Sequence, residues 1–301
     1  MTPVLEGTPR GPTRWLRELA GFGSSTVIDQ AARLGSNLVV AAALGPTAMG
    51  VWFLLNLVLQ YGAMVHLGVL NGMNREIPAA MARDDPEEAN RLRAVALGFV
   101  LLSFLVALGV LGGVLVPLGI VPVGSLAWLM AALLATQQLY AFAFMHLKAR
   151  TQFLAAARLQ LISGLTFPVA TIPLALTWGL EGYVAGQAIA YGLLAGIATI
   201  RAPELFRPRF DRSRSAHLVR IGFPIMLVGI TYAVFATVDR WVIQAHLGTA
   251  ALGHYSLAIM ALGAVGLLPQ VVAQQVYPRM AMAWSRNPTW SSLEPLMKRQ
   301  Q

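Results

Sequence analysis

Eight apolar segments divide this sequence, and each is long enough, at about 18 to 26 residues, to cross the ~30 Å hydrocarbon core of a bilayer as a helix. They lie near residues 22–44, 50–72, 94–116, 124–147, 159–178, 183–200, 221–245 and 252–277. A backbone in lipid must satisfy its own hydrogen bonds, which a helix does within one segment. The sequence therefore predicts an all-α fold, a polytopic transmembrane helical bundle of about eight spans.

Composition agrees with an integral membrane protein. Hydrophobic residues make up 56% of the 301 residues and charged residues only 12%, against about 25% in a typical soluble protein. The chain has no cysteine, so disulfides and thiolate metal sites are excluded. The net charge of +9 does not indicate nucleic-acid binding, because cytoplasmic loops of membrane proteins accumulate Lys and Arg.

The basic residues predict the orientation. With the N-terminus placed in the cytoplasm, 20 of the 22 Lys and Arg residues fall in the N-terminal segment, the inner connections and the C-terminal tail. The other two, Arg33 and Arg240, lie inside spans, and the short outer connections carry none. The positive-inside rule therefore predicts a multi-pass protein of the cell inner membrane with a cytoplasmic N-terminus. Outer connections this short also argue against an enzyme acting on extracytoplasmic sugars.

The spans group into two unequal parts. We expect a cytoplasmic N-terminal segment (1–21), a six-helix N-terminal lobe (22–200), a basic cytoplasmic linker (201–220), the first two helices of a second lobe (221–278) and a cytoplasmic tail or loop (279–301). The linker is the best boundary, because it holds six arginines and two prolines and such a segment rests on anionic headgroups.

An internal repeat relates the two lobes. The stretch from Leu44 to Trp52 corresponds, at an offset of 203 residues, to the stretch from Leu247 to Tyr255, and both carry a Leu-Gly turn. Six spans separate the copies, so both have the same orientation in the membrane. This predicts parallel repeats related by an axis along the membrane normal, with a solute path between the lobes.

The first span carries a polar face. Asp29, Arg33 and Asn37 recur every four residues in an otherwise apolar helix, so they stack along one side. A charge at this depth costs ~2.5 to 3.5 kcal/mol on insertion scales and normally faces a bundle interior or a water-filled cavity. Two interpretations stay open: a structural ion pair of Asp29 with Arg33, or the wall of a cavity for an anionic or sugar-bearing solute.

Further polar side chains inside spans complete the set of substrate-cavity candidates. Asn56 and Gln60 lie in the second span, and Asp239 and Arg240 in the seventh, with Arg240 at the repeat position of Asn37. Asp239 and Arg240 are adjacent, about 100° apart on a helix, so they face different neighbours. The sequence offers no catalytic triad, phosphate-cradling Gly loop, cofactor motif or metal-ligand spacing in a soluble loop.

Three stretches resemble a known family. They are Leu44 to Leu55; Leu67-Gly68 with Asn74-Arg75-Glu76-Ile77-Pro78; and Val238-Asp239-Arg240-Trp241 with Leu247-Gly248, Gly253 to Ala258, Leu268-Pro269 and Tyr277-Pro278-Arg279. In these the chain is similar to the polysaccharide transporters, or O-antigen-type flippases, of the multidrug/oligosaccharidyl-lipid/polysaccharide exporter superfamily. Members of that family have twelve or more spans in two six-helix bundles, so we expect this chain to be C-terminally incomplete.

The resemblance implies a function. It implies a flippase that moves a lipid-linked oligosaccharide of the undecaprenyl-pyrophosphate type, such as an O-antigen or lipopolysaccharide precursor, across the membrane by alternating access. Arg33 would then receive the pyrophosphate, and Asp29 would orient Arg33 or carry a coupling proton or ion. The alternatives are a cation-coupled multidrug exporter of the same superfamily and a non-transporting membrane fragment or scaffold.

Overall fold

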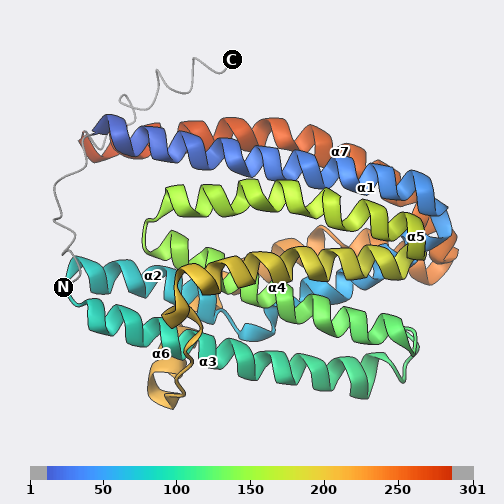
Figure 1. The fold of residues 1–301 in the computed structure, drawn as a ribbon, viewed down its shortest axis with the longest axis horizontal. Helices are drawn as coiled ribbons and strands as arrows, with labels where there is room; N and C mark the ends of the chain where they lie inside the picture. The colour runs from blue at the N-terminus through green and yellow to red at the C-terminus, as the bar shows by residue number, and fades with distance from the viewer. Residues whose placement is uncertain (1–11, 287–301) are drawn as a thin grey trace.

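The computed structural model describes residues 12–286, and every regular element among them is helical. The long helices are α1 (Pro12–Gly62), α2 (Val69–Ala82), α3 (Pro86–Val110), α4 (Ser125–Ala149), α5 (Phe153–Arg201), α6 (Arg212–Phe235) and α7 (Val238–Arg286) (Figure 1). Three short elements join them, namely η1 (Ala63–His66), the π-helical turn η2 (Leu111–Leu115) and η3 (Pro203–Phe206). The predicted all-α bundle is confirmed. The predicted segments 1–21 and 279–301 lie partly outside the described residues.

Three of the helices reverse direction at an internal glycine. Gly45 in α1, Gly179 in α5 and Gly248 in α7 have φ angles of 78°, 62° and 81°, a left-handed region that only glycine adopts readily. Each glycine falls between two predicted spans. The described chain therefore traverses the bundle in eight legs, and Figure 1 shows these three reversals at the end opposite the α2–α3, α4–α5 and α5–α6 connections.

The second leg is not the continuous helix that the sequence predicted. It breaks at η1, after which Leu67 and Gly68 have φ angles of 50° and 80°. His66 stabilises this break, because its Nδ1 accepts a hydrogen bond of 3.1 Å from the Gly68 amide. The reason lies in packing: Gly68 touches the backbone of Gly222, and Gly72 touches the backbone of Leu218, so α2 and α6 approach at van der Waals contact.

The two repeated turns have the same backbone and meet one another. Gly45 (φ 78°, ψ 173°) and Gly248 (φ 81°, ψ 179°) are repeat counterparts. Next to them, a Cβ on Gly50 would overlap the carbonyl oxygen of Thr249, and a Cβ on Gly253 would overlap the carbonyl oxygen of Pro46. These two contacts exchange under the repeat offset, so a local two-fold relationship runs through the turn region where α1 packs against α7.

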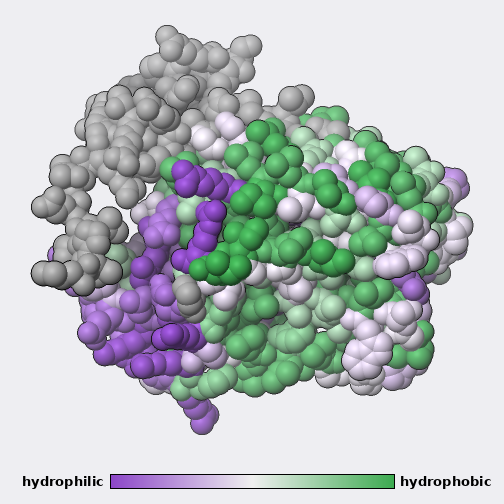
Figure 2. All heavy atoms as spheres, in the orientation of Figure 1, coloured by the Kyte–Doolittle hydropathy of each residue, from purple (hydrophilic) through white to green (hydrophobic). Residues whose placement is uncertain are grey.

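The outer surface of the bundle is apolar around its middle. Trp128, Leu165, Val169 and Tyr232 are 72–80% exposed, and several helices are long and apolar enough to cross a membrane. Figure 2 shows hydrophobic side chains over the middle of the molecule and hydrophilic ones gathered at one end, which we call the basic end. The basic end carries the α2–α3, α4–α5 and α5–α6 connections. This surface is that of a multi-pass membrane protein.

Candidate functional site

We use first lobe for the helices before the 201–220 linker and second lobe for those after it, as names for these parts of the chain. A cavity of about 680 Å³ lies between helices of the first lobe and α6. The second leg of the chain supplies Asn56, Gln60 and Asn71 to its wall, and α4 supplies Gln137, Gln138, Tyr140 and Phe144. Ile225, Met226 and Gly229 of α6 close the other side. Helices α1, α2 and α4 of the first lobe and α6 of the second therefore line a space large enough for an organic ligand.

The wall combines amide groups with aromatic rings. Gln138 is held by a 3.4 Å hydrogen bond from its Nε2 to the carbonyl of Ala63, while the Oε1 of Gln137 is buried with no hydrogen-bond partner among the described residues. Side-chain amides donate and accept hydrogen bonds at once. Such a wall suits a ligand rich in hydroxyl groups, and none of the cavity-lining residues is Asp or Glu.

Of the predicted cavity candidates, Asn56 and Gln60 lie in this wall. Asp29, Arg33, Asn37, Asp239 and Arg240 do not line it. Their roles as substrate contacts stay predictions, and their surroundings are described in turn below.

Arg33 lies inside the first lobe, where every nitrogen of its guanidinium has a partner. Its Nε donates to both carboxylate oxygens of Asp29, at 3.0 and 3.2 Å. Its two terminal nitrogens donate to Tyr191 (3.0 Å) and Ser163 (2.6 Å). The guanidinium also lies over the ring of Phe167, 4.3 Å from its centre. The first leg is thus joined to the fifth and sixth legs by a charged group whose hydrogen bonds the protein itself satisfies.

The Asp29–Arg33 pair lies close to the cavity but does not line it. Gly164 has no side chain, so α5 approaches the backbone of Asp29, whose Cα would lie 3.1 Å from a Cβ on that glycine. The ring of Tyr191 lies 5.3 Å from that of Tyr140, a residue of the cavity wall. Arg33 therefore sits one layer of aromatic rings behind the wall.

Asn37 also has a partner within the first lobe. Its side-chain oxygen accepts a hydrogen bond from the hydroxyl of Tyr183, which is fully buried. The ring of Tyr183 in turn meets Trp52 edge-on at 4.9 Å. Asn37 therefore ties the first leg to the sixth.

Asp239 and Arg240 face different neighbours, as the sequence predicted. Asp239 accepts a 2.6 Å hydrogen bond from the hydroxyl of Tyr255, within the second lobe. Arg240 extends toward the first lobe, with its guanidinium 5.8 Å from the ring centre of Phe53. Its Nε is buried and has no hydrogen-bond partner among the residues that the structure describes.

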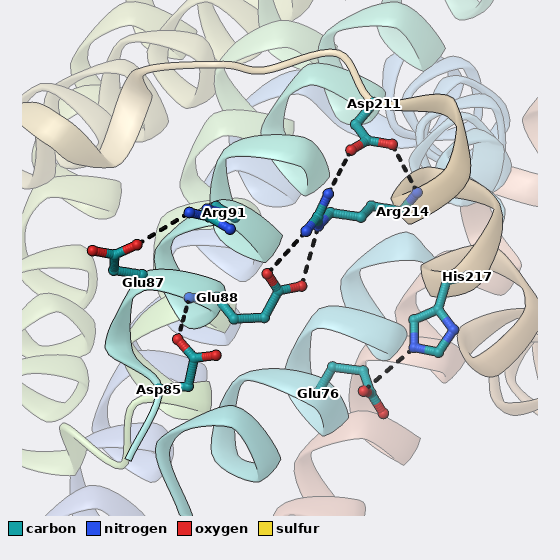
Figure 3. A network of polar contacts seen from close by, with 8 residues as sticks. All are labelled: Glu76, Asp85, Glu87, Glu88, Arg91, Asp211, Arg214 and His217. Atoms are coloured by element: carbon teal, nitrogen blue, oxygen red, sulfur yellow. Dashed lines mark hydrogen bonds and ion pairs between the residues drawn. The ribbon is translucent and has the colours of Figure 1, made fainter. Parts of the chain in front are cut away.

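At the basic end a polar network joins the two lobes (Figure 3). Arg214 of α6 donates to both oxygens of Glu88 on α3, at 3.1 and 3.2 Å, and to Asp211 at 2.8 Å. His217 of α6 lies 3.4 Å from Glu76 of α2. The α3 end of the network is a regular helix start, because the side chain of Asp85 accepts a hydrogen bond from the amide of Glu88.

The sequence did not predict the aromatic part of the cavity wall, which Tyr140 and Phe144 supply. A signal is present in the spacing, because residues 137, 140, 141 and 144 follow the pattern i, i+3, i+4 and i+7 and so share one face of α4. Within residues 12–286, no three His, Asp or Glu side chains lie close enough together to hold a metal ion.

Comparisons with solved structures identify the fold. The chain is similar to an inward-facing multidrug resistance MATE family transporter of the MOP superfamily, with a TM-score of 0.62 and 16% identity over 90% of this chain and 64% of that one. A MOP superfamily transporter from Pyrococcus furiosus gives a TM-score of 0.56 and 15% identity over 93% of this chain and 73% of that one. A Vibrio cholerae MATE transporter in its bent form gives a TM-score of 0.53 and 18% identity over 88% of this chain and 66% of that one.

The chain thus spans about two thirds to three quarters of the length of these structures. A comparison with curated protein sequences gives no match. A sequence model of the family described as polysaccharide biosynthesis protein matches residues 95–287, which is more than half of the chain. This chain is therefore a member of the polysaccharide biosynthesis protein family, and its helical bundle agrees with that membership.

Proposed function

We propose that this protein is a membrane flippase that moves a lipid-linked oligosaccharide across the cytoplasmic membrane by alternating access. The observation that carries the proposal is the cavity between the lobes, with its wall of Asn, Gln and aromatic side chains. Membership of the polysaccharide biosynthesis family supports a sugar-bearing substrate.

The chemistry of the cavity favours a neutral, hydroxyl-rich group. Asn56, Gln60, Asn71 and Gln137 each carry an amide, which pairs with a sugar hydroxyl as both donor and acceptor. Phe144 and Tyr140 offer ring surface for the apolar face of a sugar. The runner-up, a cation-coupled multidrug exporter, is favoured by the likeness in fold to MATE transporters, but coupling to a cation would call for a carboxylate in the cavity without a balancing arginine, and this wall contains no Asp or Glu.

Contacts at the two ends of the bundle support alternating access. At the turn end, Gly50 meets Thr249 and Gly253 meets Pro46. At the basic end the lobes are held by ion pairs of long side chains. Separating one set of contacts while the other holds would expose the cavity to one side of the membrane at a time.

The remaining assignments follow from the charges. The basic end lies in the cytoplasm and the repeated turns lie outside, by the positive-inside rule, which makes the inner membrane of the cell the site of action. The resemblance to O-antigen-type flippases implies a lipid carrier of the undecaprenyl-pyrophosphate type. Arg240, whose Nε has no partner among the described residues, and Arg33, after release of Tyr191 or Ser163, would receive that anion, while Asp29 would orient Arg33 or carry a coupling proton or ion.

The cavity is tested by removing its amides. Asn56→Ala with Gln60→Ala should lower surface glycan about fivefold or more for each hydrogen bond lost to the substrate, since one such bond contributes ~1 kcal/mol. Membrane abundance should stay unchanged. Asn74→Ala, an exposed asparagine outside the cavity, is the matched control.

Glycan export is measured by surface labelling in cells that express the full-length protein, alongside efflux of a cationic dye. Unchanged glycan in the abundant double variant would reject the sugar site. Loss of dye efflux with normal glycan would establish the multidrug exporter instead.

A further inference from the structure

A second cavity, of about 230 Å³, lies at the basic end between the end of α4, the start of α5 and the end of α5. It is separate from the cavity between the lobes, with which it shares no residue. Arg150, Arg158 and Arg201 line it together with His146, against a single acid, Glu204. Three arginines and a histidine therefore converge on one small space.

The other side of this cavity is apolar. Leu147, Leu159, Ile162 and Ile197 supply its inner surface. Beside it on the surface, Leu154 is 50% and Ile200 81% exposed, which indicates that the cavity opens where the bundle faces lipid. A basic group of side chains above an apolar slot is the arrangement that matches a phosphate headgroup attached to an acyl chain.

Two of the polar atoms have no hydrogen-bond partner in the described part of the chain. His146 is only 8% exposed, and its Nδ1 is buried with no hydrogen-bond partner among the described residues. The Nε of Arg150 is buried and unpartnered in the same way, although its terminal nitrogen donates to Asn90. A buried donor without a partner is costly, so a ligand that accepts hydrogen bonds here would be stabilising.

The two exposed arginines are also available. Arg158 and Arg201 form no ion pair or side-chain hydrogen bond with any residue in the described part of the chain. They lie at opposite ends of α5, which doubles back at Gly179, so the fold brings them to the same cavity. Neither residue is engaged in holding the helices together.

We propose that this cavity binds the headgroup of an anionic phospholipid from the leaflet at the basic end. The phosphate lies among Arg158, Arg201 and Arg150, with His146 donating from within, and one acyl chain lies along Leu159 and Ile162. The site is independent of what the cavity between the lobes transports. A soluble phosphate has the same anionic chemistry but would leave the apolar slot empty, which the experiment below distinguishes.

The experiment uses the full chain in nanodiscs of phosphatidylcholine with phosphatidylglycerol, and counts retained lipids by native mass spectrometry. Wild type should retain phosphatidylglycerol in preference to phosphatidylcholine. Arg158→Gln with Arg201→Gln should lose about fivefold in retention for each arginine removed, the effect of one basic residue near an anionic surface. Arg75→Gln with Arg83→Gln removes the same charge from exposed positions outside the cavity and should retain the lipid.

Equal retention in the two double variants would overturn the proposal. Inorganic phosphate is then added to the wild type in a second arm. Displacement of phosphatidylglycerol by phosphate would assign the site to a soluble anion and contradict the lipid site, whereas unchanged retention supports it. Identical elution of all variants in size-exclusion chromatography establishes that they are folded.

Discussion

Gly50 packs so closely against Thr249 that its backbone touches the carbonyl of the residue from the other lobe. No side chain fits between them, since even a methyl group would overlap the oxygen. The reciprocal contact of Gly253 with Pro46 makes the same demand.

Gly50→Ala is therefore expected to destabilise the protein by ~1 to 3 kcal/mol, the usual cost of overpacking, and to lower glycan export. Gly35→Ala is the matched control, because a methyl group there meets nothing within 4 Å and alanine favours the helix. The thermal unfolding of purified protein, followed by fluorescence-detected chromatography, checks both. Equal behaviour of the two variants would show that the turns do not pack as described.

The partners of Arg33 predict a double-mutant result. Arg33→Gln alone leaves the buried Asp29 carboxylate without its cation, which should cost about 3 to 5 kcal/mol and lower membrane abundance. Asp29→Asn with Arg33→Gln should restore abundance, because no unpaired charge remains. Export should nevertheless stay low, because Arg33 is proposed to receive the pyrophosphate of the substrate. An abundant double variant with near-normal surface glycan would reject that role and leave Arg33 as a structural partner of Asp29.

The Glu88–Arg214 pair provides a way to lock the basic end. The chain contains no cysteine, so Glu88→Cys with Arg214→Cys introduces the only thiols. A short bifunctional thiol reagent should join them and abolish export, since α3 and α6 are then unable to separate. Glu87→Cys with Arg91→Cys is the control, because that pair also lies 3.1 Å apart but within one helix. Export that survives complete cross-linking would contradict movement at this end.

Asp211 predicts a dependence on pH. The amide and guanidinium of Arg214 donate to its carboxylate and lower the pKa of Asp211. A lowered pKa stabilises the folded protein above the unfolded pKa of about 3.9, and this contribution is lost as the pH falls through the folded value. Asp211→Asn should therefore lower the unfolding temperature at neutral pH and have less effect in acid. An equal decrease of the unfolding temperature at every pH would show that the charge of the Asp211 carboxylate does not stabilise the fold.

The orientation is tested by single cysteines at the two ends. Val123 is 84% exposed at the turn end, whereas Ser213 is exposed at the basic end. A membrane-impermeant thiol reagent should label Val123→Cys in intact cells and Ser213→Cys only after permeabilisation. The opposite pattern would invert the assignment of the basic end to the cytoplasm.

Much of the fold could be predicted because the apolar runs in the sequence show the length of each membrane helix and where it ends. The positions of Gly45, Gly179 and Gly248 were expected from the apolar runs on either side. The break at Leu67-Gly68 was not, because its cause is the contact of Gly68 with Gly222, which is distant in the sequence. The local sequence shows that residue 68 is a glycine but does not show that it packs against Gly222.

The site was predicted less well for the same reason. Periodicity placed Asp29, Arg33 and Asn37 on one face, but the direction in which that face points depends on which helices surround it. In the structure α5 supplies Ser163, Tyr191 and Tyr183 to them, and the cavity forms on the far side of Tyr140. The charged residues of the first span stand out in the sequence, whereas uncharged amides line the larger of the two cavities.

The position of the paired glycine turns also determines how far the opposite end of the bundle moves when the helices tilt. The first leg runs from the Gly45 turn toward the basic end, and the part from Gly21 to Leu44 alone is about 36 Å long at ~1.5 Å per residue. If the touching turns serve as a fulcrum, a tilt of about 10° there displaces the far end of that lever by about 6 Å. While the turn end is closed, a small rotation there is thus enough to separate side chains completely at the basic end.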